Sequence, residues 1–171
     1  MVTQSVELLL DEATAAAVRA QWDALAEAGL PSQARHTGEC NRPHVTMAAR
    51  RAIDPALEPA LSDAVSPLPL PLRVGAVACF GRGPYVLVRV VVANRALLDL
   101  QAAVTAALGP DPRTAHHFAP GNWTPHVSLA RRLTADQVGR ALAALGAAPD
   151  LAGHAVACRR WDGDARLEWR L

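Results

Sequence analysis

The sequence of 171 residues contains no lysine and few aromatic residues, with four tryptophans, two phenylalanines and one tyrosine. Its 17 basic residues, histidine aside, are therefore all arginines, and 16 acidic residues bring the formal net charge to +1. This balance gives no global attraction to nucleic acid, which a broad basic surface would provide. The absence of lysine is typical of a GC-rich bacterial genome, so arginine content alone is no sign of phosphate binding.

The chain also lacks an uninterrupted apolar run long enough to cross a bilayer, although hydrophobic types make up 51% of it. We therefore expect no membrane span. Residues 1–7 lack the basic and long apolar segments of a signal peptide. The three cysteines, Cys40, Cys79 and Cys158, form no Cys-x-x-Cys pair, and an odd, widely spaced set suits a reducing compartment. Together these features predict a cytoplasmic protein.

Two short motifs nearly repeat each other, Pro43-His44-Val45-Thr46 and Pro125-His126-Val127-Ser128. In each, a histidine and a hydroxyl stand at positions i and i+2, which point to the same face of a β-strand. A single His-x-Ser/Thr triplet is a weak signal. These two share Pro-His-Val, and the offset from His44 to His126 also relates other segments of the chain, which makes coincidence a poor explanation.

The repeat extends over the whole chain. The shift that places His44 on His126 aligns an apolar segment and an alanine-rich segment of the first half with similar segments of the second half, without a gap. A period of this length is too long for a solenoid unit. The sequence thus predicts one domain over residues 1–171 with two similar lobes, about 1–84 and about 85–171, and residues 164–171 as a segment that the lobes could exchange.

Local patterns predict the order of the elements. Strands are expected at residues 4–10, 43–49, 72–80, 85–92, 125–130, 155–161 and 166–171. Helices are expected at residues 11–28, 54–66 and 94–109 and from 134 onwards, where Thr134 and Gln137 form a capping-box pattern. The polar segments 31–42 and 110–124 show no period and are expected to be loops.

Placed side by side, the two motif strands would present His44 and Thr46 across a cleft from His126 and Ser128. Cleavage of a phosphodiester needs a base for the attacking oxygen and an acid for the leaving oxygen. Histidine titrates near neutrality and can serve in either role. Hydroxyl groups can donate to the non-bridging oxygens, where negative charge is concentrated. We therefore predict a catalytic site of these four residues that needs no metal or other cofactor.

The remaining histidines are weaker candidates. His116 and His117 stand together in a predicted loop, where they could bind a metal or act as a base. His36 and His154 have no partner motif, so we expect them at the surface or in satisfied core positions. A zinc ion held by the two motif histidines is the alternative to the metal-free site, but zinc usually takes three protein ligands.

Through His44-Val45-Thr46-Met47 and His126-Val127-Ser128-Leu129 the chain resembles the 2H phosphoesterase superfamily, named for two His-x-Thr/Ser-x motifs. Within it, the bacterial branch labelled 2′-5′ RNA ligase or RNA 2′,3′-cyclic phosphodiesterase is the most similar. The resemblance covers nearly the whole chain. It implies an α+β, duplicated two-lobed fold, in which two antiparallel sheets flank a central cleft and helices lie on the outside.

The resemblance also implies a reaction, the metal-independent hydrolysis of a 2′,3′-cyclic phosphate to a 2′-phosphate. The substrate would be an RNA end or a small cyclic nucleotide, and the enzyme a monomer. His126 would activate water and His44 would protonate the leaving 3′ oxygen. The alternatives are 2′-5′ RNA ligase activity and a non-catalytic module that binds nucleotide or RNA. Two titratable residues in matching positions argue against the non-catalytic module.

Residues near the motifs are candidates for substrate binding. The family often carries an aromatic residue five positions after the first histidine and an arginine five positions after the second, which contact the terminal base. Arg131 matches the arginine, whereas Ala49 stands where the aromatic residue would be. We expect Trp123 or Tyr85 to provide the stacking surface instead, and Arg50 to contact phosphate.

Overall fold

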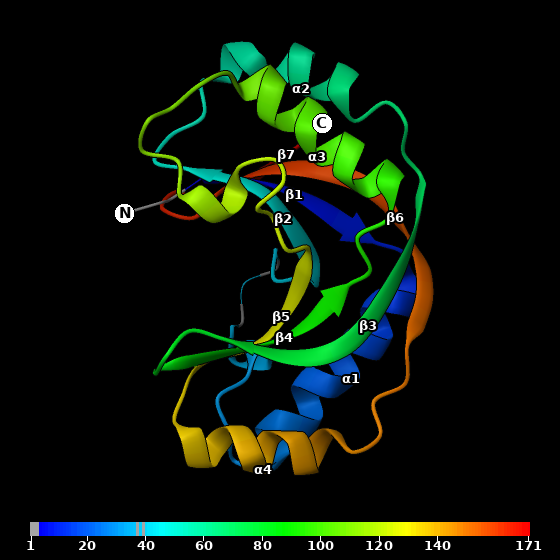
Figure 1. Cartoon of the computed structure of the whole chain (residues 1–171), viewed down its shortest axis with the longest axis vertical. Coiled ribbons are helices and arrows are strands. Elements are labelled where there is room, and N and C mark those ends of the chain that lie inside the picture. The colour runs from blue at the N-terminus through cyan, green and yellow to red at the C-terminus, as the bar shows by residue number, and fades with distance from the viewer. Residues whose placement is uncertain (1–3, 37, 39) are drawn as a thin grey trace.

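The computed structural model describes residues 4–36, 38 and 40–171 (Figure 1). Residues 1–3 of the N-terminal segment, and residues 37 and 39 of the predicted loop 31–42, lie outside the described residues. Strands occupy β1 (Gln4–Leu10), β2 (His44–Arg50), β3 (Leu70–Phe80), β4 (Tyr85–Val91), β5 (His126–Leu133), β6 (Leu151–Asp162) and β7 (Leu167–Arg170). Helices occupy α1 (Glu12–Glu27), α2 (Glu58–Ala64), α3 (Arg95–Leu108) and α4 (Ala135–Leu145). The predicted α+β class is confirmed.

The strands form one antiparallel sheet in the order β2-β1-β6-β3-β4-β5, with β7 paired to β6. The expectation of two separate sheets is therefore wrong. The long strands β3 and β6 pair with each other through residues 70–74 and 151–155, so the hydrogen bonding continues across the middle of the molecule. Beyond that stretch, β6 pairs with β1 and β3 pairs with β4. The sheet bends sharply along these two strands (Figure 1).

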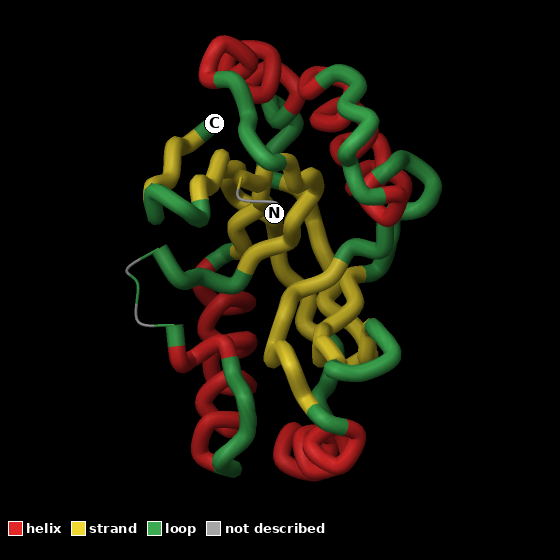
Figure 2. The backbone as a smooth tube through the Cα atoms, turned by 90° about the vertical axis from the view of Figure 1, so that its left-hand side faces the viewer, coloured by secondary structure: helices red, strands yellow, loops and turns green. Residues whose placement is uncertain are grey.

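The order strand, helix, strand, helix, strand occurs twice, as β1-α1-β2-α2-β3 and β4-α3-β5-α4-β6. The first strand of each set has equivalent neighbours in the sheet. β1 lies between β2 of its own set and β6 of the other set, and β4 lies between β5 of its own set and β3 of the other set. The helices are exchanged, because α1 packs with α4 near β5 and α3 packs with α2 near β2. Figure 2 shows the helices on the outer sides and the strands between them. The duplicated two-lobed arrangement stays a prediction.

Capping residues set the starts of three helices. Asp11 and Asn94 each accept a hydrogen bond from the backbone N–H three residues further on. Thr134 and Gln137 form the predicted capping box. The polar segments expected to be loops contain short 3₁₀ helices, η1 (Gln33–Arg35) and η3 (His116–Phe118). Within the described part of the chain, no helix is both long enough and apolar enough to cross a bilayer.

The core lies between the sheet and the helices that cover it. On α1 the buried residues Val18, Trp22 and Leu25 recur every three or four positions, which places them on one helical face. Leu97, Leu100 and Val104 do the same on α3. Successive residues of a strand point to opposite faces of the sheet. A strand that buries one face against these helices therefore presents its other residues on the concave side of the bent sheet.

Candidate active site

The histidines of the two motifs are the first residues of β2 and β5, and the alternation along each strand directs the motif side chains. On β2, His44 and Thr46 are half-buried on one face, while the valine and methionine between and after them are fully buried on the other. On β5, His126 and Ser128 follow the same pattern. The shared Pro-His-Val sequence thus produces the same local arrangement twice.

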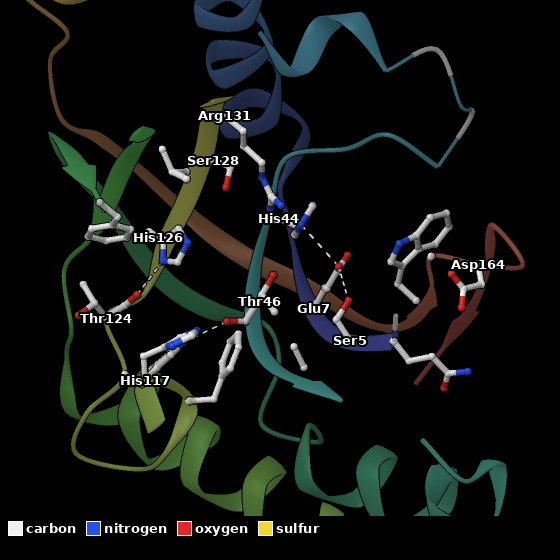
Figure 3. Close-up of a pocket in the computed structure, with 18 residues that line it drawn as sticks. Ser5, Glu7, His44, Thr46, His117, Thr124, His126, Ser128, Arg131 and Asp164 are labelled. Atoms are coloured by element: carbon white, nitrogen blue, oxygen red, sulfur yellow. Dashed lines mark hydrogen bonds and ion pairs between the residues drawn. The ribbon is translucent and has the colours of Figure 1, made fainter. Parts of the chain in front are cut away.

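All four motif side chains line one pocket of about 830 Å³ (Figure 3). The pocket is open between β2 and β5, which are the first and the last strand in the order of the sheet. The other lining residues come from β1, β3, β4 and β6, from the β6–β7 turn and the loop around η3, and from later positions of β2 and β5. These wall residues are Gln4, Ser5, Glu7, Ala49, Phe80, Val86, His117, Phe118, Trp123, Thr124, Arg131, Trp161, Gly163 and Asp164.

Both imidazoles are oriented by the same kind of backbone contact. His44 Nδ1 lies 2.7 Å from the carbonyl oxygen of Arg42, and His126 Nδ1 lies 2.8 Å from that of Thr124. A carbonyl oxygen can only accept, so Nδ1 carries the hydrogen and donates it. Nε2 of each ring is therefore the nitrogen available for proton transfer to a ligand in the pocket.

The pocket wall beside His44 is charged. His44 Nε2 lies 3.6 Å from Oε1 of Glu7, a carboxylate that is only 3% exposed. Ser5 Oγ donates to Oε1 at 2.6 Å, and Arg159 donates to Oε2 at 2.8 Å. Burial alone would raise the pKa of Glu7, but the positive charges of His44 and Arg159 and the hydrogen bonds lower it below its usual value. Glu7 is therefore ionised at neutral pH.

An aromatic side chain lies beside His126 in the pocket wall. The ring of Phe80 meets the imidazole edge to face, with centroids 4.9 Å apart and planes at 87°. Burial lowers the pKa of His126, and the positive charges of Arg131, His44 and His117 lower it further, although its backbone hydrogen bond acts in the opposite direction. At neutral pH this imidazole is therefore uncharged, with a lone pair on Nε2.

Of the four residues expected to bind substrate, two line the pocket and two lie outside it. Arg131 and Trp123 line the pocket. Trp123, however, is only 7% exposed, and its indole N–H donates to the backbone carbonyl of Thr46 at 3.0 Å. Much of its ring is therefore committed to packing and to fixing β2, and a smaller part faces the pocket.

Tyr85 and Arg50 lie outside the pocket. Tyr85 packs against the hydrophobic core at the start of β4. Arg50 is turned away because its guanidinium donates to the backbone carbonyls of Leu108 and Gly109 at the C-terminal end of α3. Neither residue is placed to contact a ligand between the two motifs.

Sequence reasoning missed the residues that β1 and β6 contribute to the pocket. Glu7 is the only charged residue in the apolar strand β1, and this exception was a signal that could have identified it. Trp161 lines the pocket beside Ser5, its partner in the β1–β6 pairing. No local pattern distinguishes this tryptophan from one in the core.

The paired histidines of the η3 loop diverge. His117 lines the pocket, whereas His116 lies near the side-chain amide of Asn122, at 3.2 Å. Gln101 of α3 donates to the carbonyl of Phe118 at 2.8 Å and so ties this loop to the helix. Among residues 4–36, 38 and 40–171, no group of three or more potential ligands is placed to hold a metal ion.

Comparison with known proteins identifies a family for most of the chain. A family model described as the 2′-5′ RNA ligase superfamily matches residues 11–165. No curated protein matches the chain. The matched range contains both motif strands, β2 and β5, whereas β1 with Glu7 precedes it.

Proposed function

Since the chain belongs to the 2′-5′ RNA ligase superfamily, whose members are phosphoesterases or ligases, we propose that it is a cyclic phosphodiesterase. Its reaction would convert the 2′,3′-cyclic phosphate of an RNA end or of a small nucleotide to a 2′-phosphate. One observation carries this proposal. Two imidazoles with available Nε2 atoms face one pocket, and each is accompanied by a hydroxyl two residues further along its strand.

The reaction uses the two imidazoles as base and acid. The base removes a proton from water as the water oxygen bonds to phosphorus, and the bond from phosphorus to the 3′ oxygen breaks. The acid gives its proton to the 3′ oxygen, so the products are a 2′-phosphate and a free 3′ hydroxyl. The hydroxyls of Thr46 and Ser128 donate to the non-bridging oxygens, where charge increases in the transition state.

The rest of the pocket supplies groups suited to a nucleotide. Arg131 extends into it from β5 and adds a positive charge for the phosphoryl group (Figure 3). Trp161 and Phe118 line it and are half-buried, so their rings are available to stack on a base. We assign the stacking role to these two residues in place of Tyr85.

The second candidate function is ligation of RNA ends through a 2′-5′ linkage, and the volume of the pocket supports it. Ligation is the same displacement at phosphorus, with a ribose 5′ hydroxyl in place of water as the nucleophile and the 3′ oxygen again as the leaving group. It requires room for nucleosides on both sides of phosphorus. A volume of about 830 Å³ lies in the upper part of the range for small-ligand sites.

The test is hydrolysis of a nucleoside 2′,3′-cyclic phosphate and of a short RNA with a cyclic end, in the presence of EDTA. We expect a 2′-phosphate product from the wild type. His44→Ala and His126→Ala should each lower turnover by about 10²- to 10⁴-fold.

Two results would overturn this proposal. Near-normal activity in either histidine variant would mean that the catalytic pair is a different one. Loss of activity in EDTA, restored by zinc or manganese, would mean that the chemistry needs a metal. A ligated product from 2′,3′-cyclic and 5′-hydroxyl ends, without hydrolysis, would favour the ligase.

A further inference from the structure

The two walls of the pocket differ at positions that the strand pairing makes equivalent. On β1, Glu7 lies opposite Thr46 of β2. On β4, Val88 lies opposite Ser128 of β5. The carboxylate beside the first motif therefore has a buried valine as its counterpart beside the second.

The next strand on each side repeats the difference. Arg159 of β6 lies opposite Glu7, and Ala78 of β3 lies opposite Val88. One motif strand is thus backed by a buried ion pair, and the other by small apolar side chains. The two imidazoles of the pocket, His44 and His126, therefore lie in different electrostatic surroundings.

Glu7 is held so that one carboxylate oxygen faces the imidazole of His44. Arg159 occupies Oε2 at 2.8 Å and also pairs with Glu168 of β7, which fixes the guanidinium. Ser5 holds Oε1 with a 2.6 Å hydrogen bond. The same Oε1 lies 3.6 Å from His44 Nε2. This separation exceeds a hydrogen bond, so Glu7 acts on the ring through its charge without taking its proton.

We propose that Glu7 is a positioning residue that keeps a proton on His44 Nε2, and that it thereby makes His44 the acid and leaves His126 as the base. A fixed negative charge at this distance, on a carboxylate that is only 3% exposed, stabilises the imidazolium over the neutral ring. Because no hydrogen bond traps the proton, Nε2 remains able to deliver it to the leaving oxygen. This inference rests on the proposed acid–base function.

Other charged groups also face His44, from each element packed around it. They are His126 and Arg131 from β5, His117 from the η3 loop, Arg159 and Glu168 behind Glu7, Asp164 after β6, and Arg35, His36 and Arg166 around an adjoining groove. The four arginines among these are positive and oppose a proton on His44, whereas Glu168 and Asp164 are acidic. Among the described residues, the carboxylate that forms an ion pair with this imidazole is Glu7.

The first experiment compares the pH–rate profiles of the wild type and Glu7→Gln with a nucleoside 2′,3′-cyclic phosphate. Glutamine keeps the shape and removes the charge, so His44 loses its proton at lower pH. We expect the alkaline limb to move to lower pH by about one unit or more, with the acid limb unchanged. On the alkaline limb a shift of one unit lowers kcat about tenfold, whereas at pH values well below that limb the two proteins differ little.

Two variants control for structural effects. Glu7→Asp keeps the charge and should restore most of the wild-type alkaline limb. Glu58→Gln removes a carboxylate that pairs with Arg160, the neighbour of Arg159 on the opposite face of β6, and lies outside the pocket. It should leave the profile unchanged. An unchanged alkaline limb in a folded Glu7→Gln protein would overturn the proposal.

A second measurement needs neither the variant nor a substrate. NMR titration of the imidazole ring protons, assigned with His44→Ala and His126→Ala, follows the charge of each ring in the wild type. We expect His44 to keep its proton to higher pH than His126, and the reverse order would overturn the proposal. Because this titration is independent of turnover, the expected order in a protein that hydrolyses no cyclic phosphate would contradict only the proposed function.

Discussion

The hydroxyls of Thr46 and Ser128 reach the pocket from residues whose backbones are fixed by other contacts. The carbonyl of Thr46 accepts a hydrogen bond from the indole of Trp123, and that of Ser128 accepts one from the indole of Trp22, each at 3.0 Å. Each contact joins the two halves of the chain. Removing a hydroxyl should therefore leave the strand in place and take away only a hydrogen-bond donor.

Replacing either hydroxyl residue by alanine tests its role in charge stabilisation. We expect Thr46→Ala and Ser128→Ala each to lower kcat by about one to three orders of magnitude, because a donor to the phosphoryl oxygens is lost. Thr46→Ser keeps the donor and serves as the matched control, with near-normal kcat. Full kcat in both alanine variants would show that the hydroxyls do not touch the phosphoryl group in the transition state.

The lowered pKa of His126 has a measurable consequence for the acid limb of the pH profile. A base functions only while it is neutral, and burial together with nearby positive charges keeps this ring neutral below its ordinary pKa. We therefore expect the acid limb of kcat/KM to lie below about pH 6.5, the ordinary value for histidine.

One of the charges responsible can be removed directly. Arg131→Gln takes away a positive charge near His126, so the imidazole binds a proton more readily and the acid limb should move to higher pH. Arg113→Gln is the matched control, since Arg113 is exposed and pairs with Asp111 outside the pocket. An acid limb that stays in place in Arg131→Gln would mean that another group controls it.

At the scale of elements, the sequence predicted most of the strands and helices because the signals are local. The alternation in residues 4–10 corresponds to β1, and the capping pattern at Thr134 and Gln137 starts α4. The continuous sheet could not be predicted, because it depends on the pairing of β3 with β6, which lie far apart in the sequence. Likewise, Arg50 near a motif gives no local sign that it will cap a distant helix.

The same limit explains why the sequence repeat concealed the role of Glu7. The gapless shift that places His44 on His126 also places Glu7 on Arg89, which suggests two charged counterparts. The strand pairing, however, places Val88 opposite Ser128 as it places Glu7 opposite Thr46, so Val88 is the structural counterpart. Arg89 is instead fully buried and donates to backbone carbonyls, including that of Gly75 at 2.6 Å. Register is set by the assembled sheet, so a gapless alignment misassigns this position.

The exchange of helices between the halves leads to a prediction about Trp22. This residue of α1 reaches the second motif strand, so Trp22→Phe keeps an aromatic ring and removes the N–H that holds the carbonyl of Ser128. We expect a loss of about 1 kcal/mol in the free energy of unfolding, measured with urea, and a several-fold lower kcat. Trp169→Phe is the control, because the ring of Trp169 on β7 stacks against the guanidinium of Arg160. This variant should leave kcat unchanged. Equal kcat in the two variants would mean that α1 does not help to position Ser128.

At the scale of the whole molecule, the positive charges near the pocket are largely balanced within the protein. Arg159 pairs with Glu7 and Glu168, and Arg42 also pairs with Glu168. On the other face of β6, Arg160 pairs with Glu58. With a formal net charge of +1, little uncompensated charge remains to follow a long phosphate backbone.

Salt dependence measures how much of an RNA strand the protein contacts. Each neutralised phosphate of a single strand contributes about −0.7 to the slope of log affinity against log salt. If the pocket holds only the cyclic end and its immediate neighbour, the slope for an RNA with a cyclic end should be no steeper than about −1.5. A nucleoside 2′,3′-cyclic phosphate, measured as 1/KM in parallel, provides the reference. A slope of about −3 for the RNA would instead mean that arginines of the adjoining groove, such as Arg35 and Arg166, bind further phosphates along the strand.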